Sequence, residues 1–436
     1  MIEPKPVEEL CADLIRCDTS NGGPGRAKGE WQAADLVAER LTEAGLTPTL
    51  LERSPGRSNV VARVPGTDRT LPPILVHMHL DVVPADESEW TVPPFGGEIR
   101  DGYVWGRGAV DMKDMCATVL TTMQRWAAEG RGPRRDIVLA FVADEEATSY
   151  YGAQWLVDAH RELFDGCVAA FSESGGFTVP MRAEDGSPVR LYPVGTAERG
   201  TAHLRLTANG RAGHGSRRND DNAVVTLANA ISRLAAHQWP VHLTPAVVEF
   251  LRQTCAALGV PCDLSDVDAT VARLGPAAKL VENTVRNSTI PTVLSAGNKV
   301  NVIPAIAQAQ VDGRVLPGTE AELLAEVDRI LGPSVRRELI ANRPPVESSV
   351  VSPWFDAMAA ALRAEDPDAL VVPYCLGGGT DAKAFSQLGM ECFGFAPLLL
   401  PDGFDYRSMA HGVDERVPVE GLRFGVEVLD RFLSEC

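Results

Sequence analysis

The sequence lacks several features that define whole classes of protein. Its 436 residues contain no apolar run of membrane length, and the opening MIEPKPVEEL is acidic and proline-bearing, unlike a signal peptide. The nine cysteines include no CxxC pair, and such an odd, unpatterned set suits reduced thiols better than a disulfide framework. These absences predict a soluble, cytoplasmic protein that does not insert into a membrane.

Positive charge is also scarce. Lys and Arg number 41 against 59 Asp and Glu, which gives a net charge of -18. This excess of acid argues against nucleic acid and anionic membranes as partners. It leaves anionic substrates open, because a bound metal ion can dominate the local field.

The order of predicted strands and helices indicates two domains, which a chain of 436 residues also favours. Strands and helices alternate in the first half, which predicts an α/β domain with a mixed sheet flanked by helices on both faces. After about Thr196 the pattern changes to alternating strands and long helices, typical of α+β structure. We predict a catalytic domain of residues 1–196 and 343–436 and an inserted lid of residues 197–342. Residues 243–298 give no clear pattern.

The stretch LVHMHLDVVP places His77, His79 and Asp81 at alternating positions. In an extended strand all three side chains would project to one side. The stretch is therefore either a buried strand with incidental histidines or part of a metal site. Position alone does not decide which histidine would bind the metal.

Polar side chains follow four apolar strands or precede a helix, and in open α/β sheets ligands bind at the carboxyl ends of the strands. The residues are His79, Asp81, Asp111, Glu145, Glu146 and Glu173. Converging carboxylates repel one another, and one or two dications would remove that conflict. Imidazole with carboxylates is a ligand set for zinc, with cobalt or manganese as substitutes, and the number of ligands fits two metals about 3.5–4 Å apart.

An ordered set of motifs carries a resemblance to a known family. The motifs are HLDVVP, GRGAVDMKD, ADEEATSYYGA, GHGS, NVIP, VDGR, GGGTDA and HGVDE. Together they resemble the dinuclear-zinc deacylase and carboxypeptidase family, which includes aminoacylase, acetylornithine deacetylase, succinyl-diaminopimelate desuccinylase and glutamate-releasing carboxypeptidases. The match runs from about Val7 to the C-terminus. One such motif is weak, whereas eight in order are specific.

The resemblance implies a role for each residue of the metal centre. The ligand in the family's His-x-Asp unit matches His79, so His77 is interpreted as a packed strand residue. Asp111 would bridge two metals, one also bound by His79 and Glu173, the other by Glu146 and His411. Asp81 would orient His79 by accepting its second ring N–H. Glu145 would be the general base, against the alternative that the DEE run is a solvated acidic helix start.

The resemblance also implies substrate-binding residues. His214 in AGHGS would polarise the substrate carbonyl, often from the partner subunit. The carboxylate of the substrate would be held by Asn301, Arg314 and Arg343, although a strand-end salt bridge is an alternative for Arg314. Gly378 and Gly379 would let the backbone approach the ligand closely. Arg217 and Arg218 stand where relatives often have a proline, and their role is open.

The resulting hypothesis is hydrolysis of the amide bond of an N-acyl amino acid or small peptide that bears a free carboxylate, with two divalent metal ions, most simply zinc. A homodimer through the lid is expected if a second copy covers its helix pair and sheet edge. Two rival hypotheses remain: a dipeptidase or aminopeptidase with the same metal chemistry, and a non-catalytic relative that binds its ligand without cleaving it. The acyl group and the released amino acid are not predicted.

Overall fold

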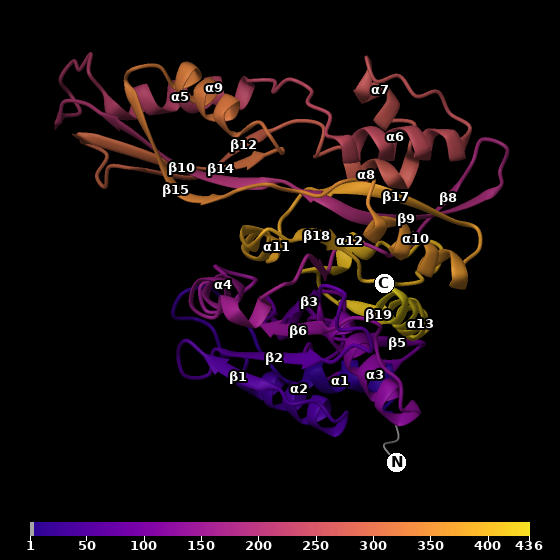
Figure 1. Ribbon diagram of the computed structural model, residues 1–436. Helices are drawn as coiled ribbons and strands as arrows, with labels where there is room; N and C mark the ends of the chain where they lie inside the picture. The colour runs from indigo at the N-terminus through magenta and orange to yellow at the C-terminus, as the bar shows by residue number, and fades with distance from the viewer. Residues whose placement is uncertain (1–3) are drawn as a thin grey trace.

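The computed structural model describes residues 4–436, and its largest element is a ten-stranded mixed sheet (Figure 1). The strand order is β1-β2-β6-β3-β7-β18-β9-β16, and β17 and β8 also pair with β9. The strands are β1 (Thr49–Glu52), β2 (Ser58–Val64), β3 (Ile74–His79), β6 (Ile137–Val142), β7 (Ala169–Ser172), β8 (Val179–Arg182), β9 (Pro188–Glu198), β16 (Val346–Glu347), β17 (Ala369–Leu376) and β18 (Glu391–Gly394). This sheet, with helices on both sides, confirms the predicted fold class.

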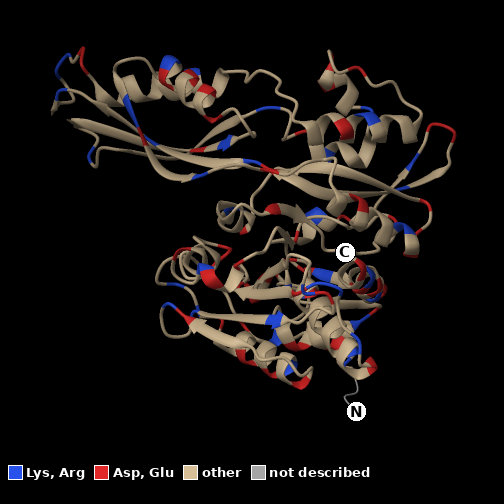
Figure 2. Cartoon of the chain, viewed as in Figure 1, with Lys and Arg blue, Asp and Glu red and all other residues tan. Residues whose placement is uncertain are grey.

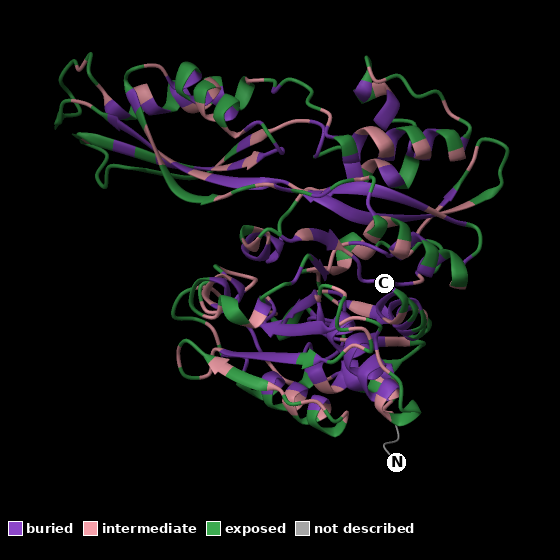
Figure 3. Ribbon diagram, in the orientation of Figure 1, coloured by how far each residue is buried: buried purple, intermediate pink, exposed green. Residues whose placement is uncertain are grey.

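Both faces of the central strands are buried, which explains why they are continuous apolar runs in the sequence (Figure 3). In β6 the residues Ile137, Leu139 and Phe141 belong to one hydrophobic cluster, and the three that alternate with them belong to another. The first face is covered by α1 (Val7–Arg16), α2 (Trp31–Glu43), α3 (Lys113–Glu129), α10 (Pro353–Glu365) and α13 (Val419–Glu435). The second is covered by α4 (Ala153–Ala159) and α11 (Ala382–Phe385).

A separate four-stranded antiparallel sheet forms the lid, in the order β12-β14-β10-β15. Its strands are β10 (Gly200–Asn209), β12 (Ser288–Ala296), β14 (Ile306–Val315) and β15 (Val335–Arg343). One face packs on α5 (Ala223–Ala236) and α9 (Glu320–Leu331) around a hydrophobic cluster of its own. Leu204 and Leu206 point into this cluster, as the alternation in the sequence predicts.

The segment 243–298, which shows no clear pattern in the sequence, ends in the lid strand β12, and its earlier part folds as helices against the other domain. These are α6 (Pro245–Leu258), α7 (Val267–Val271) and α8 (Ala278–Val281), and Figure 1 places them over β9 and β17, away from α5 and α9. Phe250 and Leu251 of α6 belong to the cluster of the large sheet. The division into residues 1–196 with 343–436 and residues 197–342 stays a proposal. It assigns this helical segment to the lid, whereas the segment packs on the large sheet.

No helix in the described part of the chain has the length and apolar character needed to span a bilayer. Figure 2 shows Lys and Arg interspersed with Asp and Glu along both sheets and their helices. The chain passes between the two sheets twice, at Arg199 between β9 and β10 and at Pro344 and Pro345 between β15 and β16. These two passages lie beside the cavity that contains the functional groups.

Candidate metal centre

The ends of three neighbouring strands bring the predicted ligands together. β3 pairs in parallel with both β6 and β7, so the carboxyl ends of all three meet at one edge of the sheet. His79 ends β3, Glu146 lies in the turn after β6, and Glu173 directly follows β7. Asp111 lies just before α3. His411 comes from the C-terminal part of the chain, between α12 (Tyr406–Met409) and β19 (Arg416–Pro418).

The two carboxylate oxygens of Asp111 face two different imidazoles. His79 Nε2 lies 3.0 Å from Asp111 Oδ1, and His411 Nε2 lies 3.3 Å from Asp111 Oδ2. The same Nε2 atom of His79 lies 3.8 Å from Glu173 Oε1, and the same Nε2 atom of His411 lies 3.0 Å from Glu146 Oε2. This is the arrangement expected for a carboxylate that bridges two metals, and the mixture of imidazole and carboxylate donors fits divalent cations such as zinc.

Ligand atoms of His79, Glu145 and Glu173 lie within 4.8 Å of one another, as do those of His79, Asp111 and Glu146. Glu145 therefore lies close enough to His79 and Glu173 to act on a water molecule at a metal that these two residues would bind. Burial raises the pKa of Glu145 well above its ordinary value, and the charges of Glu173 and Asp381 add to this effect. A carboxyl group with a raised pKa is suited to taking up and releasing a proton near neutral pH.

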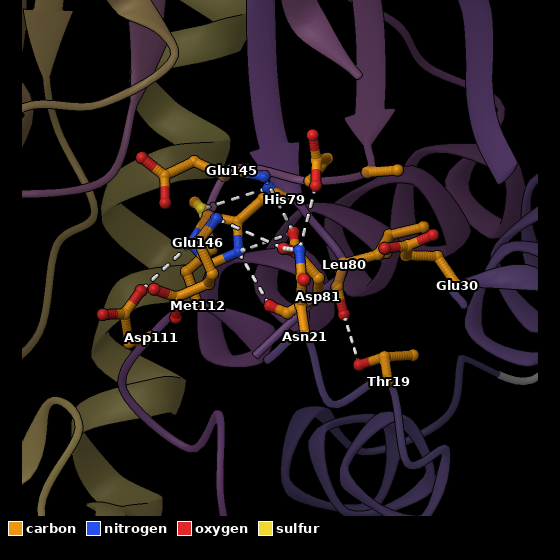
Figure 4. Close-up of polar contacts among 12 residues, drawn as sticks. Thr19, Asn21, Glu30, His79, Leu80, Asp81, Asp111, Met112, Glu145 and Glu146 are labelled. Carbon is orange, nitrogen blue, oxygen red and sulfur yellow. Dashed lines mark hydrogen bonds and ion pairs between the residues drawn. The ribbon is translucent and has the colours of Figure 1, made fainter. Parts of the chain in front are cut away.

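Asp81 supports the centre in a different way from the predicted one. The Nδ1 of His79 lies 2.9 Å from the backbone carbonyl oxygen of Asp81, whereas the nearest oxygen of the Asp81 carboxylate is 3.7 Å away (Figure 4). The carboxylate instead accepts hydrogen bonds from the backbone N–H groups of Glu145 and Glu146, at 3.1 and 3.2 Å. With Nδ1 donating to the carbonyl, Nε2 is left free to bind a metal.

Asn21 contributes a contact that the sequence did not point to. Its side-chain amide donates to the Asp81 carboxylate at 2.9 Å and to Asp144 at 3.1 Å (Figure 4). Asn21 is distant in sequence from the metal-binding motifs. It belongs to the stretch TSNGG, which carries only an ordinary turn signal. It holds the Asp81 carboxylate against the turn that carries Glu145 and Glu146.

His77 is packed inside the sheet. Its side chain is 2% exposed, its ring centroid lies 4.7 Å from that of Phe385, and its Nε2 has no hydrogen-bond partner among the described residues. Burial lowers the pKa of His77 to about 3, so the ring is neutral at physiological pH. The geometry agrees with the interpretation of His77 as a packed strand residue.

We expect His77→Phe to keep its metal and its activity, because Phe preserves the ring contact with Phe385 and the buried Nε2 that it removes has no hydrogen-bond partner among the described residues. Metal content per chain and turnover, each compared with the wild type, check this. His79→Phe is the matched change two residues away and should lose metal. Loss of metal from the His77 variant as well would contradict the assignment of His79 as the ligand.

A cavity of about 810 Å³ opens between the metal centre and the lid. It is lined by the predicted metal ligands Asp111, Glu146, Glu173 and His411, by Glu145, and by Arg314, Arg343, Gly378 and Gly379 from the predicted substrate-binding set. His203, Thr380 and Lys383 also line it, although the sequence analysis did not select them. Thr380 belongs to the motif GGGTDA but was given no role, whereas His203 is brought to the cavity by the register of β10 against β14.

The two cavity arginines differ in how fully their charge is neutralised. Arg314 makes a bidentate contact with Asp312, at 2.8 and 3.1 Å, which is the salt bridge considered as an alternative for it. Arg343 donates to the Ser149 hydroxyl at 3.3 Å and to the Thr148 carbonyl, and no carboxylate of residues 4–436 lies within salt-bridge distance of it. Arg343 is therefore the cavity arginine with the freer charge.

His214 and Asn301 lie away from this cavity. They are exposed on a two-stranded ribbon of β11 (Gly213–His214) and β13 (Val302–Ile303), where Gly215 N–H donates to the Asn301 carbonyl at 2.9 Å. Neither residue lines the cavity of its own chain. Within one chain, the two are brought together with each other and not with the metal centre.

The sequence of the chain is similar to those of known proteins. The family described as Peptidase family M20/M25/M40 matches residues 75–435. The probable carboxypeptidase S-like 2 of Dictyostelium discoideum is 30% identical over 381 residues, which is 82% of this chain and 70% of that protein. Human N-fatty-acyl-amino acid synthase/hydrolase PM20D1 is 28% identical over 390 residues, 86% of this chain and 76% of that protein. Pig aminoacylase-1 is 29% identical over 412 residues, 92% and 89% of the two chains.

Solved structures share the fold. The M20 metallo-carboxypeptidase Sso-CP2 from Sulfolobus solfataricus superposes with a TM-score of 0.72 at 17% identity, covering 99% of both chains. The dipeptidase Dug1p from Saccharomyces cerevisiae gives a TM-score of 0.69 at 17% identity, covering 98% of this chain and 95% of that one. At such low identity the likeness concerns the arrangement of the two domains and not the choice of substrate.

Proposed function

Because the chain belongs to peptidase family M20/M25/M40, and is thus a metal-dependent hydrolase that acts on small peptide or acyl-amino-acid substrates, we propose that it hydrolyses the amide bond of an N-acyl amino acid or small peptide bearing a free carboxylate. The observation that carries the proposal is an arginine of little-neutralised charge, Arg343, in the same cavity as the metal centre. The printed names of the relatives, carboxypeptidase, aminoacylase and N-fatty-acyl-amino acid hydrolase, are in line with it.

In this proposal His79 and Glu173 would hold one divalent ion, Glu146 and His411 would hold the other, and Asp111 would be shared by both. When bound, the ions, most simply zinc with cobalt or manganese as substitutes, polarise the scissile carbonyl and lower the pKa of the attacking water. Glu145 takes the proton from that water as its oxygen bonds to the carbonyl carbon. Glu145 then delivers the proton to the leaving nitrogen as the C–N bond breaks.

Substrate orientation is assigned to the lid side of the cavity. Arg343 and Arg314 hold the free carboxylate of the leaving amino acid, and Gly378 and Gly379, which line the cavity, let the backbone approach the ligand closely. Asp81 keeps the turn of Glu145 in place through the two backbone hydrogen bonds described above. His214 and Asn301 would act in the cavity of a second copy.

We expect Arg343→Met to raise KM for carboxylate-bearing substrates by roughly 10–100-fold, since a hydrogen bond to a charged group contributes about 1.5–3 kcal/mol. Arg314→Met should raise KM less, because Asp312 already neutralises that guanidinium. Steady-state kinetics with a substrate and its carboxamide separate the two, since only the carboxylate form should be affected. Arg336→Met, on the same strand but exposed and paired with Glu338, is the control. Equal KM changes for both cavity arginines would contradict the ranking.

A homodimer through the lid is part of the proposal. The edge strand β12 exposes Ile290 and Leu294 at 58% and 67%, and the neighbouring β14 exposes Ile306 at 53%. Apolar side chains on an uncovered sheet edge favour pairing with another chain. Such a pairing would give each cavity the His214 and Asn301 of the other copy.

We expect the wild type to be a dimer by light scattering and Leu294→Asp to be a monomer with much reduced turnover and an unchanged metal content, because the cavity would then lack His214. Val351→Asp, at an apolar position of the other domain that is 87% exposed, is a control for added charge alone. A fully active monomer would contradict this assignment.

The test of the proposed reaction compares chelator-stripped protein with the same sample after zinc, cobalt or manganese is restored. Both are assayed by chromatography against N-acyl amino acids and dipeptides, each with a free and a blocked amine. Metal-dependent cleavage of blocked, carboxylate-bearing substrates is the expected result. Cleavage of free-amine peptides alone would favour the dipeptidase or aminopeptidase alternative, and metal binding without any cleavage would favour the non-catalytic one. A cytoplasmic location stays a prediction.

A further inference from the structure

A buried ion pair lies behind the metal centre, outside every motif role assigned above. Arg107 is 4% exposed and Glu415 is fully buried, and Arg107 Nη1 donates to Glu415 Oε2 at 2.6 Å. The guanidinium also lies over the ring of Trp90, 5.2 Å from its centroid. Removing two charges from water is costly, so a fully buried pair calls for an explanation beyond packing.

The pair is bonded to the backbone beside two metal ligands. The second oxygen of Glu415, Oε1, accepts the N–H of Val110 at 2.8 Å, next to Asp111 in the chain. Arg107 Nη2 donates to the backbone carbonyl of His411 at 3.3 Å. One ion pair therefore connects the segment that precedes Asp111 with the segment that carries His411, although about three hundred residues separate them in sequence.

His411 needs such an anchor more than His79 does. The His79 side chain is 1% exposed at the end of a paired strand, whereas that of His411 is 53% exposed. His411 and Asp414 also have φ values of 61° and 58°, a left-handed conformation that residues other than glycine adopt only when surrounding contacts impose it. Glu415 lies between Asp414 and β19. Its side chain is buried and accepts hydrogen bonds from Arg107 and from the backbone N–H of Val110.

We propose that Arg107 and Glu415 are positioning residues for the second metal, which fix the backbone of His411 relative to Asp111 so that both can bind the same ion. This inference rests on the metal assignments of the proposed function but not on its substrate. Removing outer contacts of metal ligands typically weakens metal binding by about 10–100-fold. If the pair only stabilised the fold, its removal would lower the free energy of unfolding and leave the metal affinity unchanged.

The test uses the double variant R107M/E415M, because replacing both partners with apolar residues leaves no uncompensated buried charge and preserves folding better than either single change. The zinc content of dialysed protein and competition with a chromophoric chelator give the number of ions and their affinities without any substrate. We expect about two ions for the wild type, and for the variant one ion of unchanged affinity and a second weakened by about 10–100-fold. Excess zinc should restore kcat with KM unchanged.

Two further proteins make the outcome decisive. In the background of His411→Ala, adding R107M/E415M should cause no further loss of metal, because the pair acts through His411. R190M/D366M removes a different arginine–carboxylate pair of the same domain, which contacts no predicted metal ligand, and should lower stability without changing metal content. Wild-type affinity for both ions in R107M/E415M, whatever its melting temperature, would overturn the proposal. A wild type that binds a single ion would overturn the dinuclear assignment, whereas lack of amide cleavage would affect only the proposed reaction.

Discussion

Replacing Glu145 with glutamine should lower turnover by roughly 10²–10⁴-fold, as loss of a general base typically does, while metal content stays close to that of the wild type. Glutamine keeps the size of the side chain but cannot accept a proton at neutral pH. The backbone N–H of residue 145 would still bond to Asp81, so the turn should keep its conformation. Single-turnover kinetics and metal analysis on the same sample measure both effects.

The adjacent Glu146→Gln is the matched control for this prediction. Glu146 contacts His411 at 3.0 Å and is assigned as a ligand, so its change should lower metal content first and turnover as a consequence. The discrimination matters because Glu145 also lies within ligand distance of His79 and Glu173. Loss of metal from the Glu145 variant would show that the roles of the two neighbours are exchanged.

Replacing Asp111 with asparagine should abolish activity and remove or displace both metals. The reason is geometric: each carboxylate oxygen of Asp111 faces a different imidazole, and an asparagine amide offers one oxygen and one NH2 donor group in their place. Metal analysis after dialysis should give well under two ions per chain. Cobalt-substituted protein would show the same loss in its visible spectrum.

Asp114→Asn provides the control for the change at Asp111. Asp114 lies three residues further on and is 2% exposed, and burial raises its pKa to about 8, so it is largely protonated at pH 7. An asparagine there resembles the protonated acid and should leave both metals in place. If Asp111→Asn retained two tightly bound ions, Asp111 would not be the bridge.

The metal centre could be predicted from the sequence because its members belong to short motifs at strand ends. A motif of a few residues fixes local geometry, and parallel neighbouring strands then bring His79, Glu146 and Glu173 to one edge. The order of the eight motifs also indicated the family and its two-domain fold. The comparisons confirm both. The individual roles of the residues stay predictions until they are tested.

What could not be predicted depends on contacts between distant segments. The carbonyl of Asp81, and not its carboxylate, meets His79 because of how the chain turns after β3. Helix α6 packs on β9 and β17, and no periodicity in its sequence says which of two sheets its apolar face will cover. The link between Arg107 and His411 joins residues that no local pattern relates.

The place of β18 in the large sheet bears on how the protein is made. β18 lies between β7 and β9, yet it begins at Glu391, long after β9 ends at Glu198. At a ribosomal speed of roughly 5–20 residues per second, about 10–40 seconds pass before the missing strand emerges. During that interval the nascent chain exposes two unpaired strand edges, so the time available for aggregation grows as synthesis slows. On the proposed assignment, the second metal would be acquired only after His411 has been translated.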